Sequence, residues 1–327
     1  MIALGETSSV PWVLFILTVL IFLALDLGVF HRRAHVVSFR EALAWTGVWF
    51  ACAMLFAFVA APAMVDSWTR EDTLTFIAGY IIELSLSMDN VFVIALIFGF
   101  FRVPQELQHR VLFWGILGAL VMRGAMIGLG VAVIKEFEWV LYGLGGFLVF
   151  SGIKMTFASD DEVHPEKNLA IRLARKFYPV SSTLDGQRFT TLLNGRRALT
   201  PLALVLLMVE TTDLIFAVDS IPAIFGITDK GFIVFTSNVF AILGLRSLYF
   251  VLAGAIGYFR YLKIGLSIVL IFIGAKMLVD PHGHEPKWFQ RDIPTGISLA
   301  VVGAIIVTSI LMSLGVARRE KLRAGKP

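Results

Sequence analysis

The chain has 327 residues, of which 57% are hydrophobic and only 16% are charged, and its mean hydropathy is +0.82. An average soluble domain is roughly 45–50% apolar and about 25% charged, so these values exclude a soluble globular enzyme, a disordered chain and a fibrous protein. The net charge is +4, and in a membrane protein such an excess records topology and indicates no nucleic-acid partner. Cys52 is the single cysteine, which excludes an internal disulfide and a cysteine-cluster metal site.

Apolar runs predict an all-α polytopic membrane protein with about nine transmembrane helices, because about 20 apolar residues are needed to cross the hydrocarbon core. The first run is evenly apolar and no small-residue cleavage site follows it, so it is expected to remain as a span and not to be a cleaved signal. The eighth run is short and could begin earlier, near Tyr261. The runs are Val10–Phe30, Ala42–Ala61, Thr73–Phe100, Val111–Ile134, Trp139–Phe157, Thr200–Phe225, Phe232–Gly257, Ile264–Val279 and Pro294–Val316.

Lys and Arg residues alternate in density between successive loops. They are sparse before the first run and in every second loop after it, and they are concentrated in the other loops and in the tail 317–327. By the positive-inside rule, the N-terminus is expected outside and the C-terminus in the cytoplasm. The longest loop, 158–199, is then cytoplasmic. Its segment Asn168–Tyr178 has basic and apolar residues at helical spacing, so it could lie on the membrane surface or be a solvated basic loop.

An internal repeat flanks this loop. Glu83–Asn90 (ELSLSMDN) matches Asp213–Ser220 (DLIFAVDS), with acids six residues apart in both, and Phe150–Met155 (FSGIKM) matches Phe272–Met277 (FIGAKM). Each copy has three spans, so the two copies must be inverted relative to one another, an architecture typical of secondary transporters. The predicted division is 1–72, two scaffold helices; 73–157, transport repeat 1; 158–199, basic loop; 200–280, transport repeat 2; 281–327, last helix and basic cytoplasmic tail.

Charged residues inside the repeats are costly, at about 2.5–3.5 kcal/mol each at the bilayer centre. They are therefore expected to pair with one another or to line a wet cavity. Arg123 and Arg246 are expected to hold the acids in place, whereas Lys154 and Lys276 lie near span ends and are expected to reach the interface. The acids are Glu83, Asp89, Glu210, Asp213 and Asp219.

Helix geometry suggests that the two motif helices are irregular. Two residues six apart are about 120° from a common face of a helix, so an unbroken helix would present Glu83 and Asp89 poorly to one ion. Pro222 leaves the carbonyl of Val218 without its donor and supports a break in the second repeat. A broken or irregular turn is therefore predicted in each motif.

The side chains around the acids favour a hard divalent cation. The candidate ligands are carboxylates, the Asn90 amide and the hydroxyls of Ser85, Ser87, Thr211, Thr212 and Ser220. These oxygen donors suit Mg²⁺, Ca²⁺ or Mn²⁺ better than Zn²⁺, Cu²⁺ or Ni²⁺. Met88 and Met208 lie beside the motifs, and a thioether ligand would favour Mn²⁺, although core packing is the more common use of methionine. No permanently bound cofactor is predicted; the expected partners are the cation and the lipid bilayer, with a homo-oligomer possible.

The paired motifs resemble those of the TerC family of integral membrane proteins, and the long form with a basic central loop is similar to its Alx-type bacterial members. The resemblance covers nearly the whole chain and implies divalent metal efflux, chiefly of Mn²⁺, across the bacterial inner membrane. It implies that the metal is held by Glu83, Asp89, Asn90, Glu210, Asp213 and Asp219. From the residues themselves, a supporting role is expected for Met88, Met208, Ser220, Arg123 and Arg246.

The predicted mechanism is alternating access, in which the two repeats rock about a shared cluster of acids. No Walker A sequence is present, so uphill export would need a coupled gradient, most simply proton exchange on the same carboxylates. A transporter is predicted, not an enzyme, since neither of the intramembrane protease motifs GxGD and GxSG occurs. The alternatives are an exporter of amino acids or other organic solutes and a non-transporting scaffold for stress or secretion complexes.

Overall fold

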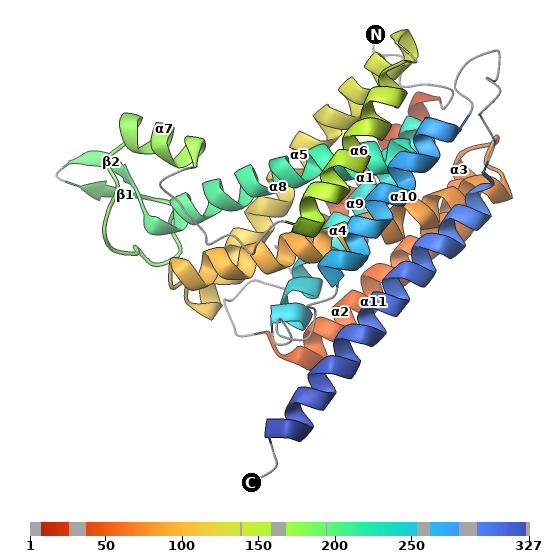
Figure 1. Cartoon of the computed structure of the whole chain (residues 1–327). Coiled ribbons are helices and arrows are strands. Elements are labelled where there is room, and N and C mark those ends of the chain that lie inside the picture. The colour runs from red at the N-terminus through yellow and green to blue at the C-terminus, as the bar shows by residue number, and fades with distance from the viewer. Residues whose placement is uncertain are drawn as a thin grey trace.

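The structure, a computed structural model, describes residues 8–25, 37–137, 139–157, 168–193, 195–253, 262–280 and 293–324. These ranges form long apolar helices and one small antiparallel sheet (Figure 1). The helices are α1 (Ser9–Leu25), α2 (Phe39–Leu55), α3 (Ala61–Met64), α4 (Arg70–Phe100), α5 (Gln105–Glu136), α6 (Val140–Phe157), α7 (Leu169–Phe177), α8 (Pro201–Phe225), α9 (Gly231–Ala253), α10 (Leu262–Val279) and α11 (Thr295–Ala324), with a π-helical segment, Phe56–Ala60, joining α2 to α3.

Seven helices within the described ranges are long and apolar enough to cross a membrane, so the chain is a helical membrane protein, as its composition predicts. They are α2 continued through α3, α4, α5, α6, α8, α9 and α11. Of the two other predicted spans, α1 is a shorter apolar helix and α10 has 18 residues. The count of nine spans stays a prediction. The ends of the first and seventh predicted spans, residues 158–167 and residues 281–292 lie outside the described residues.

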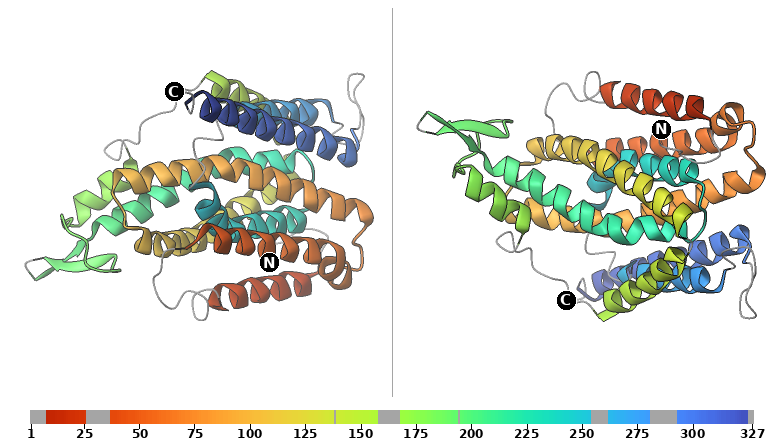
Figure 2. Two further views of the ribbon diagram at one scale, coloured as in Figure 1. Left: turned by 90° about the horizontal axis from the view of Figure 1, so that it is seen from below. Right: turned by 90° about the horizontal axis from the view of Figure 1, so that it is seen from above.

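The helices form three layers (Figure 2). Helices α1 and α2 lie on one side, α6, α10 and α11 on the other, and α4, α5, α8 and α9 between them. Helix α9 packs against α2, α4 and α5, and 94% of its most apolar 18-residue stretch is buried. A helix that is apolar all round is stable in such a central position because every face meets protein.

The helices of the two predicted repeats interleave in the middle layer. Helices α4 and α5 each pack against both α8 and α9. At the end of this layer, Asp72 and Thr69 form the capping box that begins α4, and the Asp72 carboxylate also accepts a 2.7 Å hydrogen bond from Lys230, just before α9. The repeats are therefore not two separate bodies that could rock independently.

Helices α6 and α10 pack tightly against each other. A Cβ atom at Gly274 would lie 2.6 Å from the Gly145 carbonyl oxygen, and one at Gly152 would lie 2.8 Å from that of Ser267. When the matched segments of the two repeats are superposed by sequence, Gly145 corresponds to Ser267 and Gly152 to Gly274, so each contact becomes the other on exchange. A two-fold relation between helices requires such reciprocal contacts. The inversion of the whole repeats stays a prediction.

The loop between the repeats contains more structure than its sequence suggested. Helix α7 occupies the segment expected to be helical, with Asn168 as its N-cap. The pair of β1 (Thr190–Leu193) with β2 (Arg196–Leu199) was not anticipated, although Asn-Gly at 194–195 is a strong hairpin signal in a sequence. Gly195 has a φ of 77°. The hairpin and α7 lie at the end of α8 (Figure 1).

Candidate functional site

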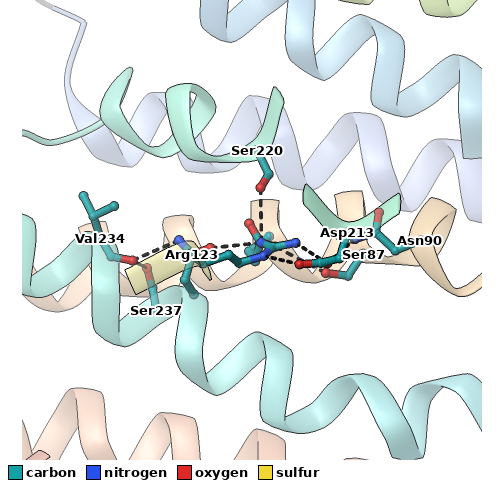
Figure 3. Close-up of polar contacts among 9 residues, drawn as sticks. Ser87, Asn90, Arg123, Asp213, Ser220, Val234 and Ser237 are labelled. Atoms are coloured by element: carbon teal, nitrogen blue, oxygen red, sulfur yellow. Dashed lines mark hydrogen bonds and ion pairs between the residues drawn. The ribbon is translucent and has the colours of Figure 1, made fainter. Parts of the chain in front are cut away.

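Arg123, on α5, lies at the centre of a buried polar network (Figure 3). Its guanidinium is 2% exposed and forms a bidentate interaction with Asp213 of α8, with distances of 2.9 Å from Nη2 and 3.2 Å from Nε to the carboxylate oxygens. Nη1 forms an ion pair with Glu83 of α4. It also donates to Ser220 Oγ at 3.2 Å and to Asn238 Oδ1 at 3.1 Å. One side chain thus ties α5 to α4, α8 and α9.

The two acids bound by Arg123 occupy matching positions in the two sequence motifs. Glu83 is fully buried and Asp213 is 12% exposed. Ser87 donates to Glu83 at 3.4 Å and Asn90 donates through Nδ2 to Asp213 at 3.3 Å. An isolated buried carboxylate is costly, whereas a paired and hydrogen-bonded one is tolerated. These contacts explain how the centre of the protein accommodates two acids.

A second polar feature lies on the other side of α4 and α8. A cavity of about 350 Å³ opens between α4, α6, α8 and α10. Its polar lining comes from both motifs and from the flanking helices: Asp89, Asn90, Ser151, Lys154, Asp219, Ser220 and Lys263. Ser151 Oγ donates to Asp219 Oδ1 at 2.7 Å. The second acid of each motif therefore faces this cavity, while the first acid faces Arg123.

Asn90 connects the network and the cavity. Its Nδ2 atom donates to Asp213, which fixes the orientation of the amide, and the residue is only 3% exposed. Its Oδ1 atom is buried and has no hydrogen-bond partner among the described residues. A buried acceptor without a donor is uncommon in proteins. Asn90 therefore belongs to both features by its position, while its Oδ1 atom is covered by protein.

The prediction of broken motif helices is wrong. Both α4 and α8 are continuous α-helices through their motifs, and α8 continues past Pro222 to Phe225. The prediction assumed that both acids of a motif face one ion. Instead, the angle of about 120° between residues six apart directs them to two different partners, so no break is needed.

The expectation of one shared cluster of acids also needs correction. No group of three or more His, Cys, Asp or Glu side chains arranged to hold a metal occurs in the described ranges. Arg123 engages Glu83 and Asp213, while Glu210 lies apart, with its carboxylate in the space that a side chain at Gly118 would fill. The acids thus lie in three places: Glu83 and Asp213 at Arg123, Asp89 and Asp219 at the cavity, and Glu210 beside Gly118.

Several of the other candidates pack or bond locally. Met88 and Met208 lie in a hydrophobic cluster with Val91, Val205 and neighbouring residues, so the packing alternative fits them better than thioether ligation. Arg246 is buried on α9. The hydroxyls of Ser85, Thr211 and Thr212 each donate to a carbonyl four residues earlier in their own helix.

Ser151, Lys263 and Asn238 are residues of the network and the cavity that the sequence did not predict. Ser151 lies within the matched segment Phe150–Met155, three residues before Lys154, so that match was the available signal. Lys276 is 6% exposed and bonds to Asp280 at 3.0 Å and to the Gly226 carbonyl at 3.4 Å. It is buried within the protein, where it connects the end of α10 to the end of α8.

These features define an integral membrane protein whose motif acids lie buried or partly buried inside a helical bundle. The family model described as "Integral membrane protein TerC family" matches residues 68–321, and the chain belongs to this family. It is 48% identical over 305 residues to the "Uncharacterized membrane protein STKORF319" of Myxococcus xanthus, covering 92% of each chain. It is 43% identical over 320 residues to the "Putative membrane-bound redox modulator Alx" of Escherichia coli (strain K12), covering 96% of this chain and 97% of the relative. No solved structure matches the chain.

Proposed function

We propose that this protein exports a divalent metal cation, Mn²⁺ in the first place, through the cavity between α4, α6, α8 and α10. The observation that carries the proposal is that Asp89 and Asp219, equivalent acids of the two motifs, line one cavity together with the buried Asn90 amide. Carboxylate, amide and hydroxyl oxygens are the ligands that Mg²⁺, Ca²⁺ and Mn²⁺ prefer. The choice of Mn²⁺ rests on the family resemblance, since the two methionines pack in the core.

The packing of the helices suggests which part moves. Arg123 ties together the four helices of the middle layer, whereas α6 and α10 pack mainly on each other, and α10 also packs on α11. The cavity lies at the boundary between these two groups. Alternating access would then come from movement of the α6–α10 pair against the middle layer. This replaces the rocking of two whole repeats, which would require breaking the Arg123 network.

The direction of transport follows from the predicted topology. The cavity extends from Asp89 and Asp219 toward Lys154, near the end of α6, and Lys263, near the beginning of α10. Both ends adjoin basic loops, which the positive-inside rule assigns to the cytoplasm. A cation could enter there and leave on the opposite side after the movement of α6 and α10.

The printed name of the Escherichia coli relative describes it as a redox modulator. In this chain Cys52 is the single cysteine, so no dithiol–disulfide pair can form within it. The acids at the cavity favour cation transport over thiol chemistry. If the protein exports an organic solute, that solute should compete with Mn²⁺ for transport. If the protein is a scaffold, no transport should depend on the cavity residues.

The test is Mn²⁺ transport by purified protein in proteoliposomes. We expect Asp89→Asn and Asp219→Asn each to reduce the transport rate about tenfold or more, because each removes one anionic ligand from the site. Asp229→Asn is the matched control, since Asp229 is exposed between α8 and α9, and it should leave the rate unchanged. Normal Mn²⁺ transport by both cavity variants would reject the proposal. The same vesicles with Mg²⁺, Ca²⁺, Fe²⁺ and Zn²⁺ establish the selectivity.

A second experiment tests the energy source. Because the chain has no Walker A sequence, we propose that protons replace the metal on the cavity carboxylates during the return step. An imposed pH gradient, acidic on the side to which the metal leaves, should then accelerate net Mn²⁺ transport and drive it uphill. The measurement follows Mn²⁺ with a fluorescent indicator at zero membrane potential. Transport that is indifferent to the gradient would refute proton coupling without affecting the cation site.

A further inference from the structure

Lys154 lies at the cavity, although its place near the end of a span predicted only a contact with the interface. It follows Ser151 by three residues, so the two side chains share one face of α6. Ser151 donates to Asp219 at 2.7 Å, so this face of α6 is directed toward that carboxylate. Both residues line the cavity, and Lys154 is exposed at its rim.

The matching lysine of the second repeat has a different environment. Lys276, on α10, is buried and paired with Asp280 at 3.0 Å, and it also donates to the Gly226 carbonyl at the end of α8. It is not among the residues that line the cavity. The two repeats thus supply lysines at equivalent positions, but the first faces the cavity acids and the second connects helices.

A cation exporter must reorient after it has released its cargo. In that step, carboxylates that bound a divalent cation would cross the low-dielectric interior as uncompensated charges, which is costly. A positive charge attached to the protein lowers this cost if it can replace the cargo at a carboxylate. Lysine suits this role because its ammonium is a compact charge on a flexible stem.

We propose that Lys154 is a tethered counter-ion that replaces the metal at Asp219 during the return of the unloaded transporter. The inference rests on the proposed function and deepens it. While the metal is bound, the Lys154 ammonium stays at the cavity rim. When the metal leaves, the ammonium moves to Asp219 and supplies one of the positive charges that exchanged protons would otherwise have to supply.

The experiment separates two modes of transport in proteoliposomes. Net efflux into metal-free buffer requires the return of the unloaded protein, whereas exchange of tracer Mn²⁺ for unlabelled Mn²⁺ at equal concentrations does not. We expect Lys154→Gln to reduce net efflux about tenfold or more while exchange remains within about threefold of wild type. Lys154→Arg keeps the charge and should retain most of the net efflux.

Lys276→Gln is the matched control for a structural role. It removes the equivalent lysine away from the cavity, so any effect should lower net efflux and exchange in the same proportion. If Lys154→Gln also lowers both modes equally, or lowers neither, the counter-ion role is wrong. If the wild-type protein carries Mn²⁺ in neither mode, the proposed function itself fails, and the inference fails with it. These outcomes are distinguishable because the wild-type rates are measured first.

Discussion

Replacing Arg123 with glutamine is expected to destabilise the protein by about 3–5 kcal/mol, because it leaves buried carboxylates without their cation. Glu83 is fully buried and Asp213 is 12% exposed, and both depend on this guanidinium for ion pairing. The same substitution removes donors to Ser220 and Asn238. Thermal unfolding in detergent, followed by tryptophan fluorescence, measures the loss.

The control for Arg123→Gln is Arg188→Gln, because Arg188 is 77% exposed and its ion pair with Asp185 spans 3.9 Å. It should change the unfolding temperature little, as exposed pairs contribute about 0–1 kcal/mol. Combining Arg123→Met with Glu83→Gln and Asp213→Asn removes all three charges and should recover part of the stability. If Arg123→Gln unfolds at the same temperature as the Arg188 variant, the buried network does not stabilise the fold.

Replacing Gly274 with alanine is expected to cost about 1–3 kcal/mol, the usual range for overpacking a close contact. The added Cβ would lie 2.6 Å from the Gly145 carbonyl oxygen and 2.8 Å from the Val149 amide nitrogen. Both neighbours are backbone atoms, so helices α6 and α10 must separate to accommodate it. Because the cavity lies beside this pair, Mn²⁺ transport should fall together with the unfolding temperature.

Gly146→Ala provides the control for the helix contact. Gly146 is on α6 next to Gly145, and nothing lies within 4 Å of a Cβ built there. Since alanine favours the helix over glycine by about 0.8–1.0 kcal/mol, this variant should be as stable as wild type or more stable. Equal stability of the Gly274 and Gly146 variants would contradict the tight α6–α10 contact.

The reciprocal contacts between α6 and α10 show what the sequence could predict about these helices and what it could not. The match of Phe150–Met155 to Phe272–Met277 identified two related segments but could not show that they pack against each other. Packing depends on the approach of backbones, which small residues such as Gly145, Gly152 and Gly274 permit. The match therefore predicted a relation between the segments, and the structure supplied the contact through which they meet.

The sequence by itself determined that this is a helical membrane protein of the TerC family with acids inside its spans. A long run of apolar residues can cross the bilayer as a helix whatever it packs against, so the spans can be predicted from the sequence alone. Only the tertiary structure decided that Glu83 and Asp213 share Arg123, that Asp89 and Asp219 face a separate cavity, and that the motif helices are unbroken. The physical reason is that pairing of buried charges depends on which helix faces lie opposite each other, and residues far apart in the chain set that arrangement.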